Sequence, residues 1–318
     1  MNEMRAALYD RYGPPEVLYE GRLPRPVPAK GEVLVRVHAT SVNGGELAGR
    51  AGKIRPVTAL ADRGFPKRAG IDFTGEIASP TAAYDVGDRV WGLLPRRFGS
   101  AAEYVAVPEN RIAPAPANLD LVQAAALPAV ATTAVTALRD KARLRPGDRL
   151  LVRGGSGGVG SVAVQLGHEY GAHVTALASP QHHEAVRALG ADEVIDYRTT
   201  SAADLPRYDV VLDTVGTELS AYRRLLTPNG RMVAIAFDLS HPVRSLSYIA
   251  GSAAFGTRRV RFFSGNPDTA LLTEVTRLTD SGALHPVVDT VFPLPKIAEA
   301  HRALEAGGIR GKLVIQIT

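Results

Sequence analysis

A glycine-rich turn near the middle of the chain is the feature whose residue types and spacing point most directly to chemistry. Gly155, Gly157 and Gly160 stand in the spacing G-x-G-x-x-G. An apolar, strand-like run ends just before this turn, and a helix-like pattern begins within it. A dinucleotide-binding site requires a strand, a tight turn and a helix in this order. The pattern therefore predicts that the turn holds the pyrophosphate of a nucleotide cofactor.

The three glycines have different expected roles. Gly155 permits the tight turn, Gly157 lets the backbone approach the pyrophosphate, and Gly160 lets the helix pack closely on the sheet. The helix N-terminus offers N–H groups and the positive end of its dipole to the phosphates. The other residues expected to contribute backbone contacts here are Ser156, Gly158 and Val159. A glycine-rich turn that binds nothing is the alternative.

The next strand-like run bears on which nicotinamide nucleotide fits the site. A site for NAD usually has Asp or Glu at the end of this strand, about 20 residues beyond the turn, where the carboxylate binds the ribose hydroxyls. Here the run His173–Ser179 ends in Ser179, which Pro180 follows. Because an acid would repel a 2′-phosphate, its absence favours NADPH. Ser179 and Pro180 also fit a helix N-cap followed by proline at the first helical position, and both roles can hold together.

The composition excludes several classes of chemistry. The chain has 318 residues, 45% of them hydrophobic and 22% charged, and contains no cysteine. This excludes disulfides, thiolate nucleophiles and cysteine-bound metals. The net charge of +5 comes from scattered basic residues, so nucleic-acid binding is not expected. Neither a signal-peptide profile nor a membrane-spanning apolar stretch is found, and we expect a cytoplasmic protein that binds no membrane.

The pattern of expected secondary structure changes about a third of the way along the chain. Up to residue 120, short strand-like runs alternate with turn signals, which predicts an antiparallel β-rich domain. From residue 121, helix-like and strand-like runs alternate, which predicts an α/β fold with a doubly wound parallel sheet. The tail returns to β character. We therefore expect residues 1–120 and 283–318 to form one domain and residues 121–282 to form the nucleotide-binding domain.

The expected elements have the following bounds. Strands are expected in the first domain at residues 33–39, 75–78, 89–93 and 102–107. The nucleotide-binding domain is expected to contain strands at 149–153, 172–178, 193–195, 208–213, 230–236 and 259–263, and helices at 121–139, 158–170, 180–189, 217–226, 242–254 and 267–281. The tail is expected to form a strand at 287–292, a helix at 295–306 and a closing strand at 312–317.

Seven short segments, taken together in their order and spacing along the chain, indicate one protein family. They are Tyr12–Leu18, Ala39–Asn43, Gly70–Gly75, Val86–Gly92, the glycine turn, Leu189–Tyr197 and Gly311–Val314. Through them the chain resembles the zinc-independent quinone oxidoreductase branch of the medium-chain dehydrogenase/reductase superfamily over nearly its whole length. The resemblance implies a GroES-like catalytic domain, a Rossmann domain that binds NADPH, and a quinone or α,β-unsaturated carbonyl as hydride acceptor. It also implies a homodimer, paired through the sheet edge near Phe262 and Phe263.

Zinc is not expected in this chain. The zinc-dependent relatives hold their catalytic metal with two cysteines and a histidine, but Asn43 and Ile71 stand at two of these positions. The histidines show no ligand spacing that would build another site. Without a metal to stabilise an alkoxide, oxidation of a simple alcohol is disfavoured. Hydride delivery to a conjugated carbonyl compound fits better, because the acceptor itself spreads the developing charge.

The resemblance implies a role for Asn43 near the nicotinamide, where its side chain hydrogen-bonds the cofactor or the substrate. A turn-forming asparagine before Gly44 is the alternative. The tyrosines that often follow this asparagine in the family are absent, so we assign no general acid, and solvent is a candidate proton source. Glu46 replaces the usual aspartate and is either the ion-pair partner of Arg50, four residues further along a helix, or a polar wall of the pocket.

Further cofactor contacts are implied at the 2′-phosphate of NADPH. Ser179 and Tyr197 match family positions that bind this phosphate. The usual Lys or Arg beyond the serine is replaced by Gln181, His182 and His183, which predicts a weaker or pH-sensitive phosphate site at His183.

The remaining implied residues lie elsewhere along the chain. Thr133 is expected on the nicotinamide side, although it also fits a helix-interior threonine bonded to its own backbone. Asp213 and Val215 close a strand where the adenosine ribose is expected, and Lys312 is expected to close over the cofactor from the tail. The aromatic residues expected to line an apolar acceptor pocket, or else to belong to the core, are Phe65, Trp91, Phe98, Phe237 and Phe263.

The sequence is also compatible with two other functions. An enoyl-thioester reductase would need a basic entry for a phosphopantetheine group. Basic residues of the first domain supply candidates for it, although a solvated surface explains them equally simply: Lys53, Arg55, Lys67, Arg68, Arg96 and Arg97. A low-turnover redox sensor would keep the NADPH site and lack the activity.

Overall fold

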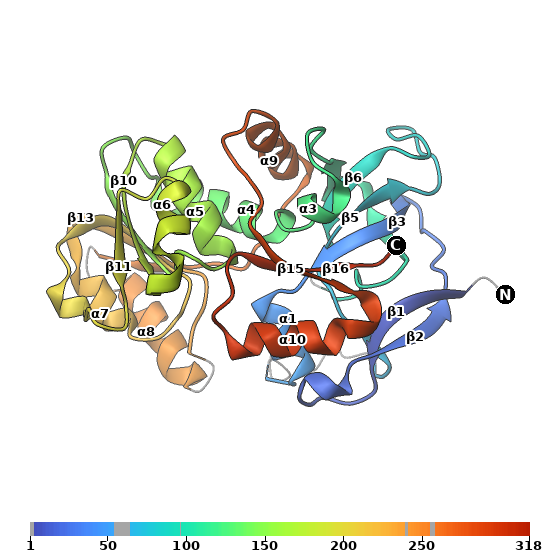
Figure 1. The fold of residues 1–318 in the computed structure, drawn as a ribbon, viewed down its shortest axis with the longest axis horizontal. Coiled ribbons are helices and arrows are strands. Elements are labelled where there is room, and N and C mark those ends of the chain that lie inside the picture. The colour runs from blue at the N-terminus through green and yellow to red at the C-terminus, as the bar shows by residue number, and fades with distance from the viewer. Residues whose placement is uncertain (1–2, 54–63, 96, 239–240, 255–257) are drawn as a thin grey trace. The chain divides into compact units, whose positions relative to one another are not determined.

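The structure is a computed structural model that describes residues 3–53, 64–95, 97–238, 241–254 and 258–318 (Figure 1). The chain forms two compact units. The first, here called the β-rich unit, comprises Met1–Thr132, Asn266–Gly282 and Pro286–Thr318. The second, here called the α/β unit, comprises Thr133–Gly265 and Ala283–His285. Arg55 and Arg96 lie outside the described residues.

The β-rich unit contains two sheets. The smaller has the order β2-β1-β4 and is antiparallel, with β1 at Glu3–Tyr9, β2 at Tyr19–Pro24 and β4 at Lys67–Arg68. The larger has the order β15-β16-β3-β5-β6-β8, and β7 pairs with β3. Its strands are β3 (Glu32–Ser41), β5 (Asp72–Ile77), β6 (Arg89–Leu93), β7 (Tyr104–Pro108), β8 (Ile112–Pro114), β15 (Val288–Pro293) and β16 (Lys312–Gln316). All pairs in this sheet are antiparallel except β15 with β16.

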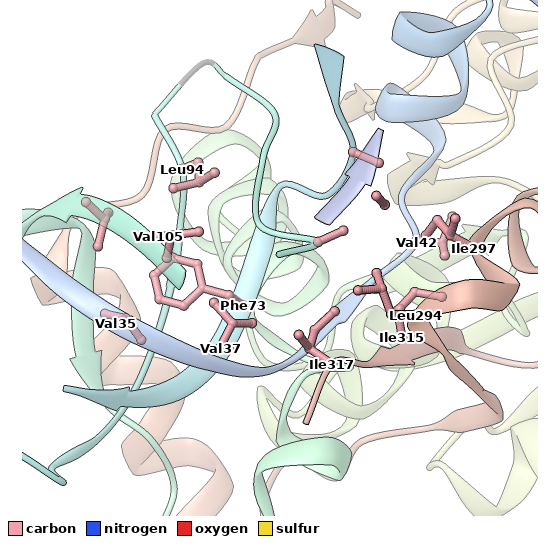
Figure 2. Packing of buried hydrophobic residues seen from close by; sticks show 14 of the residues in the cluster. Val35, Val37, Val42, Phe73, Leu94, Val105, Leu294, Ile297, Ile315 and Ile317 are labelled. Atoms are coloured by element: carbon pink, nitrogen blue, oxygen red, sulfur yellow. The ribbon is translucent and has the colours of Figure 1, made fainter. Parts of the chain in front are cut away.

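The core of the β-rich unit follows from the alternation along β3. Val33, Val35 and Val37 are buried on one face of the strand, as a period of two residues requires. They belong to one cluster with Phe73 of β5 and with residues of the C-terminal segment, among them Ile297 (Figure 2). Full burial of each such side chain contributes about 1.5–3 kcal/mol. The two ends of the chain are therefore tied together through this cluster.

The helices of the β-rich unit are short or lie late in the chain. They are α1 (Gly44–Arg50), α3 (Leu121–Ala124), α9 (Thr269–Asp280) and α10 (Ile297–Ala306), with 3₁₀ turns η1 (Pro15–Val17), η3 (Glu109–Arg111) and η7 (Leu294–Lys296). The expected single helix at 121–139 is wrong. Pro128 lacks an N–H and starts a new helix, so α3 ends before it. This new helix, α4 (Pro128–Val135), continues directly into a π-helical segment, η4 (Thr136–Ala142).

Helix α9 belongs to the β-rich unit, whereas the sequence placed residues 267–281 in the nucleotide-binding domain. The hydroxyl of Thr276 donates to the carbonyl of Pro114 at 2.8 Å. The side-chain amide of Asn118 donates to the carbonyl of Thr279 at 3.0 Å. These long-range bonds fix α9 to the region around β8, and they leave no local signal in the sequence.

The α/β unit contains a six-stranded sheet with the order β11-β10-β9-β12-β13-β14, in which every pair is parallel. The strands are β9 (Arg149–Arg153), β10 (His173–Ala178), β11 (Glu193–Asp196), β12 (Tyr208–Asp213), β13 (Leu226–Ala234) and β14 (Val260–Phe262). This is the doubly wound order of dinucleotide-binding domains, in which the strand order reverses between β9 and β12.

Helices cover the faces of this sheet (Figure 1). They are α5 (Gly158–Glu169), α6 (His183–Ala188), α7 (Leu219–Arg224) and α8 (Pro242–Ala254), with 3₁₀ turns η5 (Pro180–His182) and η6 (Ala202–Asp204). Leu150, Leu151 and Val152, three consecutive residues of β9, are all fully buried. Burial on both faces is the reason that this strand reads as a continuous apolar run. None of the described helices is long and apolar enough to cross a membrane.

Candidate active site

The glycine turn of the α/β unit connects β9 to α5 and is shaped by close backbone packing. A Cβ atom at Gly160 would clash with the carbonyl oxygen of Gly154, and a Cβ atom at Gly155 would lie 2.8 Å from the Cβ of Ala176. Gly157 is different, because a Cβ atom there would meet only the Gly154 oxygen, at 3.4 Å. Gly155 and Gly160 are therefore required by the packing of the turn, whereas Gly157 keeps the start of the helix accessible.

The backbone N–H groups at the start of α5 fit an anionic group. Gly157 is the N-cap, and the N–H of Ser161 donates to its carbonyl at 2.8 Å. The N–H groups of residues 158–160 precede this first intrahelical bond and have no acceptor within the helix. Together with the helix dipole, they fit a pyrophosphate at the turn.

Three residues expected at a 2′-phosphate come together at the ends of β10 and β11. Ser179 follows β10 and is 5% exposed. The pairing of Ala178 with Asp196 places it beside Tyr197, which is 53% exposed. The ring of His183 also lies here, with Nε2 at 3.2 Å from the carbonyl oxygen of Ala178. The hydroxyl of Ser179 caps no backbone N–H in the structure, although Ser179 precedes Pro180 as an N-cap does.

Arg198, which was not expected from the sequence, lies at the same place. It directly follows Tyr197, and its guanidinium carbon lies 5.8 Å from the centre of the Tyr197 ring. It is exposed, so its charge is available to a ligand. A basic residue after the expected tyrosine was the signal that could have identified it.

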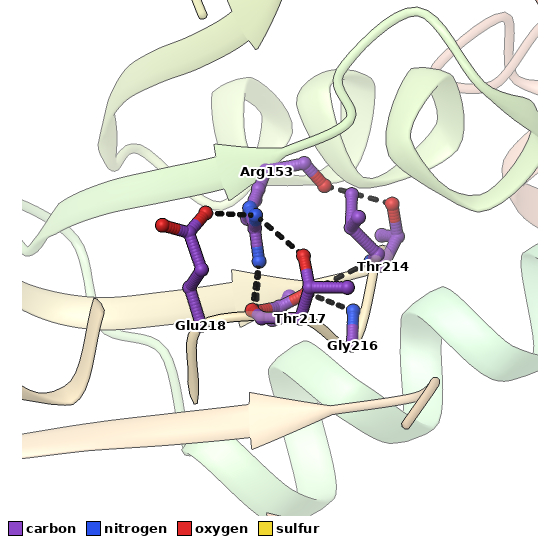
Figure 3. Close-up of polar contacts among 7 residues, drawn as sticks. Arg153, Thr214, Gly216, Thr217 and Glu218 are labelled. Atoms are coloured by element: carbon purple, nitrogen blue, oxygen red, sulfur yellow. Dashed lines mark hydrogen bonds and ion pairs between the residues drawn. The ribbon is translucent and has the colours of Figure 1, made fainter. Parts of the chain in front are cut away.

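Asp213 is the last residue of β12, before the turn around which Figure 3 shows Arg153, Gly216 and Glu218. Its Oδ1 accepts hydrogen bonds from the N–H groups of Val215 and Gly216, both at 2.8 Å. Its Oδ2 lies 3.1 Å from Nη1 of Arg153, and the side chain is 0% exposed. Both oxygens are thus engaged inside the turn after β12, and the expected contact of Asp213 with a ribose stays a prediction. Val215 is exposed beside it.

Arg153 was also missed and is central to this turn. Besides the ion pair with Asp213, its guanidinium donates to the carbonyl and the hydroxyl of Thr217 and lies 3.2 Å from the carboxylate of Glu218. It also stacks over the ring of Tyr222, with 4.1 Å from the guanidinium carbon to the ring centre. The arginine thus ties the end of β9 to the end of β12, where the strand order reverses.

The other expected residues of the α/β unit are spread over several segments. Thr133 lies in α4, partly buried, and a Cβ atom added at Gly265 would approach its hydroxyl to 3.9 Å. Phe237 packs edge-on against Phe262, with ring centres 5.7 Å apart. The ammonium of Lys141 lies 5.9 Å from the centre of the Phe263 ring. Their contacts with a cofactor stay predictions.

Two of the aromatic residues expected in an acceptor pocket belong to the β-rich unit and pack within it. Trp91 is fully buried in β6, so it is a core residue. Phe65 packs edge-on against Tyr12, with ring centres 5.2 Å apart.

Asn43 begins α1 and is held by a buried carboxylate. Oε1 of Glu46 accepts the N–H of Asn43 at 2.6 Å, and Oε2 accepts the N–H of Gly70 at 2.7 Å. Glu46 is only 3% exposed. The expected ion pair between Glu46 and Arg50 is wrong, because Arg50 pairs with Glu305 of α10 instead. Glu46 therefore anchors the backbone at Asn43, which the i,i+4 spacing did not reveal.

Lys312 lies in the same buried cluster. Its ammonium donates to the carbonyl of Val42 at 2.5 Å and to Oδ1 of Asn43 at 2.7 Å, and the residue is 5% exposed. The amide of Asn43 donates in turn to the carbonyl of Ser41 at 2.9 Å. The ammonium is directed at Asn43 inside the β-rich unit, and its expected closure over the cofactor stays a prediction.

Burial shifts the ionisation of this cluster. Burial raises the pKa of Glu46 to about 7; the N–H of Asn43 opposes this, and the negative charge of Asp72 adds to it. Burial lowers the pKa of Lys312, while Asp72 and Glu46 oppose that shift. Asp72 is itself fully buried and accepts the N–H and the hydroxyl of Ser41, at 2.9 and 2.6 Å. The ammonium of Lys312 thus bonds to Val42 and Asn43, and two buried acidic side chains, Asp72 and Glu46, act on its charge.

Two observations bear on the expectation that zinc is absent, which stays a prediction. The chain has no cysteine. Across residues 3–53, 64–95, 97–238, 241–254 and 258–318, no three His, Asp or Glu side chains gather as ligands for a metal ion.

Known proteins match both units of the chain. Residues 29–117 match the alcohol dehydrogenase GroES-like domain, and residues 189–315 match the family described as zinc-binding dehydrogenase. A chloroplastic NADPH-dependent alkenal/one oxidoreductase of Arabidopsis thaliana is 34% identical over 98% of this chain and 79% of its own length. The chain belongs to the medium-chain dehydrogenase/reductase superfamily.

Two further members show how far the similarity extends. The human mitochondrial NAD(P)H oxidoreductase RTN4IP1 is 33% identical over 99% of this chain and 89% of its own length. The solved structure of the quinone oxidoreductase from Coxiella burnetii has 30% identity and a TM-score of 0.89, and the match covers 99% of this chain and 100% of that one. The expected resemblance is confirmed, and this superfamily member combines a GroES-like domain with a Rossmann-type parallel sheet. Since relatives are named mitochondrial or chloroplastic, the cytoplasmic location stays a prediction.

Proposed function

We propose that this superfamily member is an NADPH-dependent reductase that transfers hydride to a quinone or an α,β-unsaturated carbonyl compound without a metal. The supporting observation is the pairing of two features of the α/β unit. The start of α5 offers N–H groups to a pyrophosphate. β10 is followed by Ser179 rather than an acid, and Arg198 stands just after the neighbouring strand β11. The names of relatives, an alkenal/one oxidoreductase and a quinone oxidoreductase, support the same class of acceptor.

Different residues have separate roles in cofactor binding and hydride transfer. NADPH, when bound, supplies the hydride. The N–H groups of residues 158–160 bind its pyrophosphate, and Arg198, with the hydroxyl of Ser179, binds its 2′-phosphate. Asn43 donates a hydrogen bond to the acceptor oxygen on which negative charge develops, which lowers the barrier. We assign no protein group as proton donor, and solvent delivers the proton.

The enoyl-thioester alternative gains no specific support from its candidate basic residues. The ammonium of Lys67 lies over the ring of Phe65, 5.2 Å from its centre. Burial lowers the pKa of Arg68. Arg97 donates to the carbonyl of Ala106 at 2.5 Å and lies 3.6 Å from the carboxylate of Glu32. These side chains are engaged in their own unit rather than gathered for a ligand.

The proposal is tested by following NADPH oxidation with three acceptors under one set of conditions. We expect rapid oxidation with 9,10-phenanthrenequinone or a simple enone, and slower oxidation with crotonyl-CoA. Faster turnover with crotonyl-CoA would replace the proposal by an enoyl-thioester reductase. Flat traces with all acceptors, despite NADPH binding, would contradict reductase activity and indicate a redox sensor.

We also propose a homodimer paired through β14. This strand is one of the two edge strands of the parallel sheet, with β11 at the other edge, and Phe262 on it is 37% exposed. An unpaired apolar edge favours strand pairing with a second copy. Light scattering after size exclusion should give twice the mass of the chain, and a monomer at micromolar concentration would contradict this.

A further inference from the structure

The side-chain amide of Asn43 is held in one of its two orientations by neighbours of opposite hydrogen-bonding type. The two ends of an asparagine amide have nearly the same shape, so their surroundings decide which end points where. The ammonium of Lys312 only donates, and it lies 2.7 Å from Oδ1. The carbonyl of Ser41 only accepts, and it lies 2.9 Å from Nδ2. The reverse orientation would set donor against donor and acceptor against acceptor.

This orientation decides what Asn43 offers to a ligand. Nδ2 carries two hydrogens, and the short bond to Ser41 uses one of them. The contacts of Nδ2 with Oγ of Ser41 and Oδ2 of Asp72 are both long, at 3.4 Å. Asn43 is only partly buried, whereas Lys312 and Asp72 are buried. The second hydrogen has only these two long contacts, so it is the one that we expect an incoming oxygen to accept.

The charge of Lys312 also strengthens that donor. An ammonium at hydrogen-bond distance from the amide oxygen draws electron density away from the nitrogen, which makes its remaining N–H a better donor to a negative oxygen. Little solvent reaches the ammonium to screen it. The carboxylates that face it, Glu46 and Asp72, stabilise the charge in this buried position.

We propose that Lys312 is a positioning residue for hydride transfer: its ammonium fixes and polarises the Asn43 amide, so that an N–H rather than a carbonyl oxygen meets the acceptor oxygen. This inference rests on the proposed reductase function. It replaces the expected contact between Lys312 and the cofactor by an action through Asn43.

A double-mutant cycle with Lys312→Met and Asn43→Ala tests this action. With NADPH and 9,10-phenanthrenequinone, we expect each single variant to lower kcat by about 100-fold, as loss of one oxyanion donor does. The double variant should be no slower than Asn43→Ala. Independent effects that multiply in the double variant would overturn the proposal. The control is Lys296→Met, which removes an exposed lysine of the same unit and should leave kcat unchanged.

Two further measurements separate positioning from cofactor contact and from a purely structural role. The NADPH dissociation constant should stay within about twofold in Lys312→Met, and a rise of about tenfold would show a direct cofactor contact instead. Asn43→Asp keeps an acceptor for Lys312 but has no N–H to offer. Its kcat should fall as far as that of Asn43→Ala, and near-wild-type activity would overturn the proposal even if Lys312→Met fails to fold.

A readout without turnover distinguishes failure of this inference from failure of the proposed function. In protein labelled with ¹⁵N-asparagine, the side-chain hydrogen of Asn43 that is bonded to Ser41 should exchange slowly, and its exchange should accelerate in Lys312→Met and recover in part in Lys312→Arg. Absence of turnover in the wild type, with this pattern intact, would contradict the reductase and keep the orienting contact. Unchanged exchange in Lys312→Met would overturn the orienting contact itself.

Discussion

The ammonium of Lys312 lies 2.7 Å from Oδ1 of Asn43, although 269 residues separate them. The contact exists because β16, near the end of the chain, pairs antiparallel with β3, with Val314 opposite Ser41. Asn43 stands just beyond the end of β3, at the start of α1. The C-terminal strand thus supplies the cation that orients the candidate catalytic amide.

Glu46 should make the protein less stable as the pH rises towards neutrality. Its pKa is about 7 in the folded state and 4.5 as the ordinary value, so the folded state still holds the proton where the unfolded state has lost it. This contribution to stability is complete below pH 4.5 and is lost as the pH rises through 7. Relative to Glu46→Gln, the free energy of unfolding of the wild type in urea should fall by about 3 kcal/mol between pH 5 and pH 8. A constant difference between the two proteins would contradict the raised pKa.

His301 should have the opposite effect in acid. It is fully buried in α10, and burial, followed by the charge of Arg50, lowers its pKa from 6.5 to about 3. Its contribution to stability is present above pH 6.5 and is lost as the pH falls towards 3, because only the unfolded state takes up the proton. Thermal unfolding followed by circular dichroism should show that His301→Leu loses less stability than the wild type between pH 7 and pH 4. Parallel pH profiles would show that His301 titrates normally.

Removal of Arg153 should destabilise the α/β unit. Arg153→Met leaves the carboxylate of Asp213 buried without its cation, which costs about 3–5 kcal/mol. The double variant Arg153→Met, Asp213→Asn removes both charges and should recover part of this loss, as urea unfolding would measure. A double variant less stable than Arg153→Met would show that the ion pair is not the source of the effect.

Arg198 should determine the preference for NADPH. Its removal in Arg198→Ala should weaken NADPH binding about tenfold, equivalent to about 1.4 kcal/mol, and leave NADH binding unchanged. Fluorescence titration with both nucleotides measures this. Arg187→Ala is the matched control, because Arg187 is an exposed arginine of the same unit, in α6. Equal weakening of NADPH and NADH by Arg198→Ala would remove Arg198 from the 2′-phosphate site.

The parts of the fold predicted from the sequence are those with a local cause. The glycine turn and α5 were predicted because backbone clearance dictates glycine at positions such as Gly160. The strands β9 and β12 were predicted because burial on both faces makes them continuous apolar runs. The strands β1 and β2 were missed because their mixed burial gives no clear period.

The parts of the site that were missed depend on long-range partners. The role of Glu46 depends on the N–H of Gly70, and the pairing of Arg50 depends on Glu305. A spacing of four residues favoured a pair between Glu46 and Arg50, but tertiary contacts provided better partners for both. The bonds of Lys312 likewise form only after β16 has joined the sheet.

The account depends most on docking of a nicotinamide nucleotide at the start of α5, and Gly157→Ala tests this directly. The structure accommodates a methyl group there, in ordinary contact with the Gly154 oxygen at 3.4 Å, but the group would stand where the pyrophosphate approaches. Calorimetric titration of NADPH into nucleotide-free protein should show micromolar binding to the wild type and about tenfold weaker binding to Gly157→Ala, with unfolding unchanged. Absence of binding to the wild type at millimolar NADPH, or equal affinity of the two proteins, would contradict the account.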